Sequence, residues 1–194
     1  MNGFEAIGPE YIEIAFRRAR AADPDAKLLY NDFGLTQPNE KPQGIVPLLT
    51  ELRGKVVPID GIGFQMHVWI DEGREGPPLL RDAHAQDLFL DRTRNWIAQL
   101  DSLGFAVQMT EMDVRLRQPF TQEKFEMQGR VHREALPICL EAPNCTSFST
   151  WGFSDRYSWL PFFWGSEFGA GLPLDEFYQP KPAYFGSLEA LGAR

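Results

Sequence analysis

Cysteine, histidine and basic residues are scarce in this sequence, which also lacks a long apolar run. It has two Cys and three His, and 19 Lys and Arg stand against 27 Asp and Glu, which leaves a net charge of −8. Phosphate groups are bound by basic faces, so neither nucleic acid nor an anionic membrane is an expected partner. No apolar segment approaches the roughly 18 residues of a membrane helix. The start, Met1-Asn2-Gly3-Phe4-Glu5, lacks the basic and apolar pattern of a signal peptide.

Motifs for metals, nucleotides and serine-hydrolase chemistry are also missing. Two Cys cannot supply the four ligands of a structural zinc site. His67, His84 and His132 form no His-x-His or His-x-x-x-His pair. There is no Walker loop, no Gly-x-Gly-x-x-Gly and no Gly-x-Ser-x-Gly. No metal and no cofactor are therefore expected.

The composition is typical of one globular domain. The 194 residues are 43% hydrophobic and 24% charged, which is ordinary for a folded protein and argues against intrinsic disorder. The length suits one domain and is short for two. No low-complexity tract or linker divides the chain.

Helix-like and strand-like segments alternate along the chain. Apolar residues at spacings of three and four predict helices, and short apolar runs between them predict strands. Helices are expected at about 9–23, 45–54 (beginning close to Pro47), 89–103, 125–139 and from 181, and strands at about 27–30, 62–68, 105–114 and 146–151, with a polar loop at 36–43. Strands separated by helices pair in parallel with right-handed crossovers, so the predicted fold class is α/β.

Two of the predicted strands carry pairs of polar residues on one face. Side chains alternate along a strand, so Gln65 and His67 share a face, and so do Glu111 and Asp113. Both pairs fall near the carboxyl ends of their strands, where parallel α/β folds collect ligand sites. If the strands are neighbours, Asp113 can orient the imidazole of His67. His67 can then hydrogen-bond Glu111 and keep it ionised, as a nucleophilic carboxylate requires.

Two other interpretations of these residues stay open. A Glu and an Asp at the surface end of a strand, beside a hydrogen-bonded His, would give the same pattern without any catalytic role. A metal site made from His67, Glu111 and Asp113 is a weaker alternative, because the chain has no paired His.

The segment after the last predicted strand mixes aromatic and polar residues. Trp151 and Trp159 can form the walls of a cleft, since flat apolar rings stack on sugar faces. The alternative is two core Trp, and the Gly, Ser and Asp between them argue against an entirely core position. Cys139 and Cys145 lie on either side of Pro143-Asn144, where a local disulfide and two buried thiols fit equally well.

Several segments resemble glycoside hydrolase family 10, the endo-β-1,4-xylanases, in order and spacing over nearly the whole chain. They run from Tyr11 to Phe16, from Pro24 to Asp32, from Pro58 to His67, around Glu111, from Trp151 to Trp159 and from Pro180 to Tyr184. The family folds as a TIM barrel. The resemblance implies that residues 1–194 are the C-terminal portion of a single catalytic domain. This portion would be a partial (β/α)8 barrel with strands five to eight and their helices.

The resemblance also implies roles for individual residues. Glu111 would be the nucleophile in the retaining hydrolysis of β-1,4-xylosidic bonds in xylan. His67 would contact this nucleophile, and Asp113 would be the partner of His67. The residues expected to contact the sugar are Gln65, Trp151, Trp159 and Asn31.

Part of the family pattern is missing from the sequence. The general acid/base Glu of the family lies in a Trp-x-x-x-Asn-Glu context that this chain does not contain, and Gly34 stands where the family often has a second Asn. Because retaining glycosidases need two carboxyl groups about 5–5.5 Å apart, little or no xylanase activity is expected from this chain alone. A catalytically inactive carbohydrate-binding fragment and a related barrel glycosidase acting on another β-glucan are the alternatives.

The resemblance has implications for partners and location as well. The expected ligand is xylan or a xylooligosaccharide, and the expected location is extracellular. A disulfide between Cys139 and Cys145, as in many members, fits that location. A half-barrel would leave two strand edges open. The chain is therefore interpreted first as a fragment of a longer enzyme. The alternatives are a chain that pairs with a complementary half-barrel or self-associates, and one that stays open, marginally stable and prone to aggregate.

Overall fold

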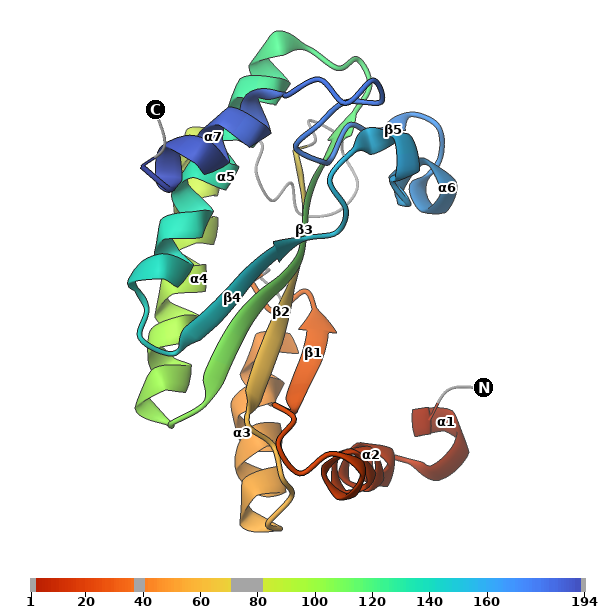
Figure 1. Ribbon diagram of the computed structural model, residues 1–194, viewed down its shortest axis with the longest axis vertical. Coiled ribbons are helices and arrows are strands. Elements are labelled where there is room, and N and C mark those ends of the chain that lie inside the picture. Colours follow the sequence, from red (N-terminus) through yellow and green to blue (C-terminus); the bar gives the residue numbers. More distant parts are fainter. Residues whose placement is uncertain (1–2, 37–40, 71–81, 193–194) are drawn as a thin grey trace.

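The computed structural model describes residues 3–36, 41–70 and 82–192, and it contains a parallel sheet with helices packed along it (Figure 1). The helices and strands follow one another in this order: α1 (Gly3–Ile7), α2 (Glu10–Ala22), β1 (Leu29–Phe33), α3 (Lys41–Gly54), β2 (Gly61–Ile70), α4 (Ala83–Ser102), β3 (Ala106–Arg117), α5 (Gln122–Glu141), β4 (Cys145–Thr150), a 3₁₀ turn (Asp155–Tyr157), α6 (Leu160–Trp164), β5 (Phe168–Gly169) and α7 (Pro182–Ala190). This succession confirms the predicted α/β class.

The strands β1, β2, β3 and β4 are neighbours in sequence order, and each pair is parallel. A helix follows β1, β2 and β3, so each of these strands is joined to the next by a helical crossover. The short β5 pairs with the end of β3 in the antiparallel sense. Within the described residues, β1 and β4 are the edge strands of the parallel ladder.

Local sequence explains where the long helices begin and end. The side chain of Asp82 accepts a hydrogen bond from the backbone N–H of Ala85 at the start of α4. Thr121 does the same for the N–H of Lys124 at the start of α5. These caps satisfy amide groups that a helix leaves without an internal partner. Gly104 follows α4 with φ of 72°, a left-handed conformation that suits glycine.

Several predicted boundaries are wrong. The strand predicted at 27–30 begins at Leu29 and continues to Phe33, because Gly61 to Gln65 of β2 supply hydrogen-bonding partners along that length. The predicted loop at 36–43 ends earlier, since α3 begins at Lys41, and residues 37–40 lie outside the described part. The helix therefore does not begin close to Pro47, which lies inside it. Burial of Ile45 and Leu49 on either side of this proline holds the helix together despite the lost hydrogen bond.

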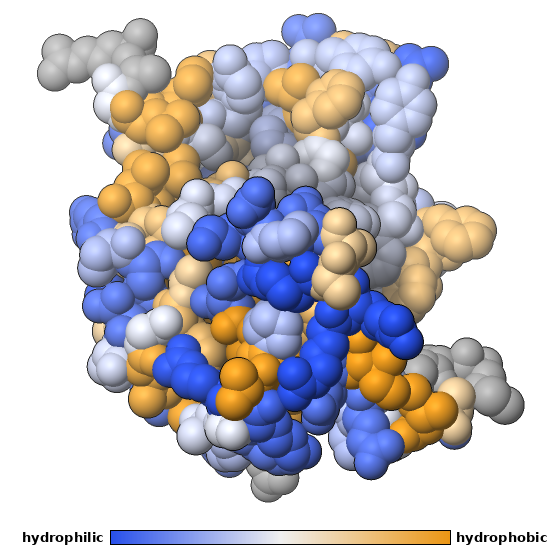
Figure 2. Space-filling model, turned by 60° about the horizontal axis from the view of Figure 1, so that its bottom comes forward, coloured by the Kyte–Doolittle hydropathy of each residue, from blue (hydrophilic) through white to orange (hydrophobic). Residues whose placement is uncertain are grey.

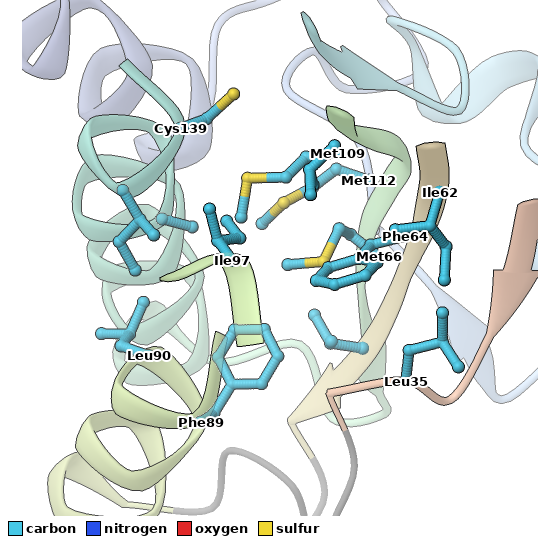
Figure 3. Packing of buried hydrophobic residues seen from close by; sticks show 14 of the residues in the cluster. Leu35, Ile62, Phe64, Met66, Phe89, Leu90, Ile97, Met109, Met112 and Cys139 are labelled. Carbon is cyan, nitrogen blue, oxygen red and sulfur yellow. The ribbon is translucent and has the colours of Figure 1, made fainter. Parts of the chain in front are cut away.

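The hydrophobic core lies between one face of the sheet and the helices α4 and α5 (Figure 3). Met66, Met109 and Met112 project from β2 and β3 toward these helices, which contribute Phe89 and Ile97 among others. All of these side chains are buried. Complete burial of one such side chain contributes about 1.5–3 kcal/mol, so the sheet and its helices form one stable layer pair.

The other face of the sheet is only half-buried and carries the polar residues. Along β2, Phe64, Met66 and Val68 are buried, whereas Gln65 and His67 between them are partly exposed. This alternation separates a core face from a site face, as the sequence predicts. Figure 2 shows one side of the molecule, where hydrophilic residues cover the centre and hydrophobic residues form separate patches. Across the described helices, none is long and apolar enough to span a membrane.

A disulfide joins Cys139, near the end of α5, to Cys145 at the start of β4. It closes the turn around Pro143-Asn144. The sequence pattern left this pairing open and the family resemblance implied it; the structure confirms it.

Candidate active site

A β-bulge in β3 places Glu111. Gln65 pairs with Thr110, but His67 pairs with Asp113, so two residues of β3 lie opposite Met66 of β2. Glu111 is at this irregularity and has φ of 59°, a left-handed conformation that is uncommon for a residue other than glycine. Thr110 and Glu111 both contact Asn31 of β1 as a result. The bulge therefore gives the site face an additional polar side chain.

Each carboxylate oxygen of Glu111 has a hydrogen-bonding partner from another strand of the sheet, one from β1 and one from β2. Asn31 Nδ2 donates to Oε1 at 2.6 Å, and Oε2 lies 3.2 Å from Nε2 of His67. Thr110 Oγ1 in turn donates to Asn31 Oδ1 at 2.8 Å, which fixes the side-chain amide of Asn31. A partner at each oxygen thus holds the carboxylate in one orientation.

His67 lies between two carboxylates. Its Nδ1 is 3.0 Å from Asp113 Oδ2, and that same oxygen accepts a hydrogen bond of 2.8 Å from Nε1 of Trp159. Asp113 is only 1% exposed, so its contacts with His67 and Trp159 are shielded from water. Burial lowers the pKa of His67, but the hydrogen bonds and charges of Asp113 and Glu111 outweigh it, and the net pKa is raised. His67 is therefore suited to donate from both nitrogens.

The raised pKa of His67 predicts a pH dependence of stability. A His with a higher pKa in the folded state adds stability that is fully present below its ordinary value of 6.5 and is lost as the pH rises through the raised value. His67→Asn should therefore flatten the decline in unfolding free energy above pH 6.5. His132 is buried, which lowers its pKa to about 4. Its titration therefore changes the stability below pH 6.5 and does not contribute to the decline above it. Urea unfolding of the wild type and of His67→Asn at a series of pH values measures how the unfolding free energy of each changes with pH. The same change above pH 6.5 in both proteins would contradict the prediction.

Two indole rings flank the imidazole. The ring centroid of Trp159 is 5.0 Å from that of His67, and the ring of Trp151 meets His67 edge-on at 6.2 Å. A cavity of about 570 Å³ opens here, within the usual range for small-molecule sites. It is lined by Phe33, Gln65, His67, Val68, Trp69, Glu111, Asp113, Arg115, Trp151, Trp159, Leu160, Phe163 and Trp164.

The structure thus brings together every residue that the sequence pointed to at this site. Asn31 does not line the cavity but contacts Glu111 from β1. Sequence reasoning missed Arg115, whose guanidinium lies 4.0 Å from the ring centroid of Trp164. Its position two residues after Asp113 was a usable signal, because alternation places it on the same face. Trp164 was missed because α6 is five residues long and too short to show a helical pattern.

Metal binding is a poor fit to this geometry. Both nitrogens of His67 are within hydrogen-bonding distance of carboxylate oxygens, at 3.0 and 3.2 Å. A metal ligand needs a free imidazole lone pair. In the portion of the chain that the structure describes, no group of three or more His, Cys, Asp or Glu side chains is arranged to hold a metal ion.

The backbone conformation of Glu111 predicts an unusual order of stability among variants. Both Glu111→Gly and Glu111→Ala remove the carboxylate, but only Gly adopts φ of 59° without steric strain. The Gly variant should be more stable than the Ala variant by about 1 kcal/mol, the reverse of their usual order within a strand. Denaturant unfolding of the two proteins measures the difference. An Ala variant at least as stable as the Gly variant would contradict the claim that the backbone at residue 111 is strained.

Parallel strands with helical crossovers, and a carboxylate, an imidazole and two indoles near their carboxyl ends, define a class: the (β/α)-barrel glycoside hydrolases. The family model for glycosyl hydrolase family 10 matches residues 2–190. The chain therefore belongs to this family.

Individual relatives agree with the family match. Endo-1,4-beta-xylanase B of Thermotoga neapolitana is 35% identical over 189 residues, which are 97% of this chain and 50% of that protein. Native xylanase 10B of Thermotoga maritima superposes with a TM-score of 0.82 at 38% identity, covering 97% of this chain and 54% of that one. Xylanase 10B of Thermotoga petrophila RKU-1, solved with xylobiose, gives 0.83 at 37% identity, with 97% and 53% covered. The chain thus spans about half the length of the curated relatives that it matches.

Proposed function

We propose that this chain carries the nucleophile half of an endo-1,4-β-xylanase that hydrolyses β-1,4-xylosidic bonds with retention. One observation supports this most strongly. Glu111 is held by Asn31 and His67 beside a cavity walled by Trp151 and Trp159. An oriented carboxylate next to aromatic walls fits attack on a sugar ring.

The proposed chemistry takes place in two steps. An oxygen of Glu111 forms a bond to the anomeric carbon while the bond from that carbon to the leaving oxygen breaks, and the leaving oxygen takes up a proton from the second carboxyl group, which the complementary half of the barrel would supply. Water then gives a proton back to that carboxylate and displaces Glu111 from the same carbon, so that the product keeps the original anomeric configuration. Asp113 has no direct part in either step, because it is buried and its Oδ2 is occupied by His67 and Trp159. It is a positioning residue for His67.

The proposed substrate is xylan or a xylooligosaccharide. Related proteins carry the name endo-1,4-beta-xylanase, and solved relatives include complexes with xylobiose and xylotriose. Trp151 and Trp159 would stack on the apolar faces of the reacting sugar, and Gln65 would hydrogen-bond its hydroxyls.

We infer that residues 1–194 form the C-terminal portion of a single catalytic domain, with β1 to β4 as strands five to eight of the family barrel. The open edges of β1 and β4 support this, because a closed barrel requires strands on both sides. The missing strands would form a complementary half-barrel. Light scattering tests the alternative of self-association, for which a concentration-dependent dimer is the expected sign.

We also propose an extracellular location. Xylan lies outside cells, and the disulfide between Cys139 and Cys145 fits an oxidising compartment. A solved relative from Thermoanaerobacterium saccharolyticum is described as an intracellular xylanase, so the disulfide rather than the family supports this location.

A substrate comparison tests the proposed function. Aryl β-xylobiosides and aryl β-cellobiosides with the same good leaving group need no proton donor, so their cleavage reports on Glu111 alone. We expect the xylobioside to be preferred and its first product, followed by NMR, to be the β-anomer. Preference for the cellobioside would indicate another β-glucan as substrate. Binding of xylotriose without cleavage would indicate the inactive carbohydrate-binding alternative.

A further inference from the structure

A second cluster of aromatic side chains lies outside the cavity. It consists of Phe153, Tyr157 and Tyr178, which are 59%, 72% and 42% exposed. None of the three lines the cavity. The rings of Phe153 and Tyr178 are nearly parallel, with 20° between their planes and 6.2 Å between centroids, and the hydroxyls of Tyr157 and Tyr178 are 3.3 Å apart. We call this cluster the aromatic platform.

The aromatic platform rests on a hydrogen-bonded framework. The backbone of Leu174 donates to Phe153 O at 2.9 Å and accepts from the N–H of Asp155 at 3.0 Å. Asp175 Oδ1 accepts from the N–H groups of Phe177 and Gln179, both at 2.8 Å, and so shapes the turn that carries Tyr178. Hydrogen bonds therefore join the segment at 153–157 to the segment at 174–179 in the absence of a ligand. Binding would then need little further ordering of the backbone that carries the rings.

Tyr178 occupies a backbone conformation that does not favour a tyrosine. Its φ of 64° lies in the left-handed region, where a bulky side chain is a genuine outlier. A glycine or asparagine would remove this strain, yet the position holds a ring stacked on Phe153. Strain kept at an exposed site points to a role of that side chain in binding.

The ligand chemistry follows from the rings and from the charge beside them. The guanidinium of Arg156 lies 5.9 Å from the ring centroids of both Tyr157 and Tyr178. Exposed, near-parallel rings bind apolar C–H faces, while the phenol and guanidinium groups hydrogen-bond hydroxyls around them. A β-linked polysaccharide chain presents both kinds of surface in alternation. It fits this platform better than a lipid surface or a nucleic acid, since the protein carries a net charge of −8.

We propose that Phe153, Tyr157 and Tyr178 form a second glycan-binding surface, separate from the cavity, that holds a β-1,4-linked chain of xylan type. The choice of glycan rests on the proposed function. Continuity of the chain supports the link between the two sites: Phe153 follows Trp151 by two residues, and Tyr157 precedes Trp159 by two. One loop thus carries the two Trp walls of the cavity and two of the three rings of the platform.

The test measures binding of the 194-residue chain to soluble xylan by affinity electrophoresis, with excess xylobiose present to occupy the cavity. The double variant Phe153→Ala/Tyr157→Ala should weaken binding about tenfold. Phe185→Ala is the matched control, because it removes an aromatic ring that is 55% exposed on α7. Binding of this variant to xylan should not differ from that of the wild type. Tyr157→Phe/Tyr178→Phe keeps the rings and should weaken binding less than the double Ala variant. Circular dichroism verifies that each variant is folded.

Several outcomes separate this proposal from its competitors. Unchanged binding of a folded double Ala variant would overturn it, and so would a wild-type chain that does not bind xylan when xylobiose is present. Loss of a dimer in light scattering, without loss of xylan binding, would show instead that the platform joins two copies. Covalent labelling of Glu111 by an activated xyloside should be the same in wild type and in the double variant. If neither the wild type nor the double variant is labelled, while the wild type still binds xylan through the platform, the proposed function would be contradicted and the proposed binding surface would not.

Discussion

Replacing Glu111 with Gln is expected to lower kcat/KM on an aryl β-xylobioside by about 10⁴–10⁶-fold, as loss of a covalent nucleophile does in other enzymes. The amide keeps the shape of the side chain and its contact with His67, but it cannot form the glycosyl-enzyme bond. An activated aryl leaving group removes the need for a proton donor, so the loss reports on nucleophilic attack. Release of the phenolate, followed by absorbance, provides the measurement.

Glu141→Gln is the matched control for this experiment. Glu141 is exposed at the end of α5, next to the amino end of β4 and thus at the opposite end of the strands from the cavity. Its variant should retain wild-type activity and stability. Equal activity of Glu111→Gln and wild type would remove Glu111 from the reaction.

Xylan itself should be a very poor substrate for a polypeptide of these 194 residues. Among the residues that line the cavity, the carboxyl groups are Glu111 and Asp113, and Asp113 is held by His67 and Trp159. An unactivated sugar alcohol leaves slowly without a general acid, which typically contributes about 10²–10⁴-fold. The ratio of xylan to aryl-xylobioside turnover should therefore be lower by about that factor than in a relative with both carboxyl groups.

The measurement is a parallel reducing-sugar assay on xylan and a phenolate assay on the aryl substrate. Addition of a complementary half-barrel that supplies a second carboxyl group about 5–5.5 Å from Glu111 should raise xylan turnover and leave aryl turnover little changed. Normal xylan turnover by the chain alone would contradict the prediction. Glu167, which is exposed after α6, would then be the first carboxyl group to replace.

The sheet could be predicted from sequence because its signals are local and repeated. Alternation along β2 separates Phe64 and Met66 from Gln65 and His67, and the structure follows that alternation. Strand ends were less predictable. β2 continues to Ile70 because it pairs with β3, and β3 continues to Arg117 because its end pairs with β5. Pairing with a neighbour, rather than propensity, sets those ends.

The contacts among the predicted site residues could be foreseen from the sequence, but the backbone that places Glu111 could not. The i, i+2 spacing of Glu111 and Asp113 predicted one shared face, and both contact His67. The bulge at Glu111 could not be foreseen, because the sequence has no glycine there to mark it. Arg115 and Trp164 meet only after β3 and α6 have folded together, so their contact has no signature in sequence spacing.

The central claim is that Glu111 becomes covalently bonded to a sugar. Incubation of the chain with a 2-deoxy-2-fluoro-xylobioside carrying a dinitrophenolate leaving group, followed by mass spectrometry of the intact protein and its peptides, tests this most directly. One label on the peptide that contains Glu111, absent from Glu111→Gln, is the predicted result. A chain that stays unlabelled while it releases the phenolate, or a label on any other residue, would contradict the account.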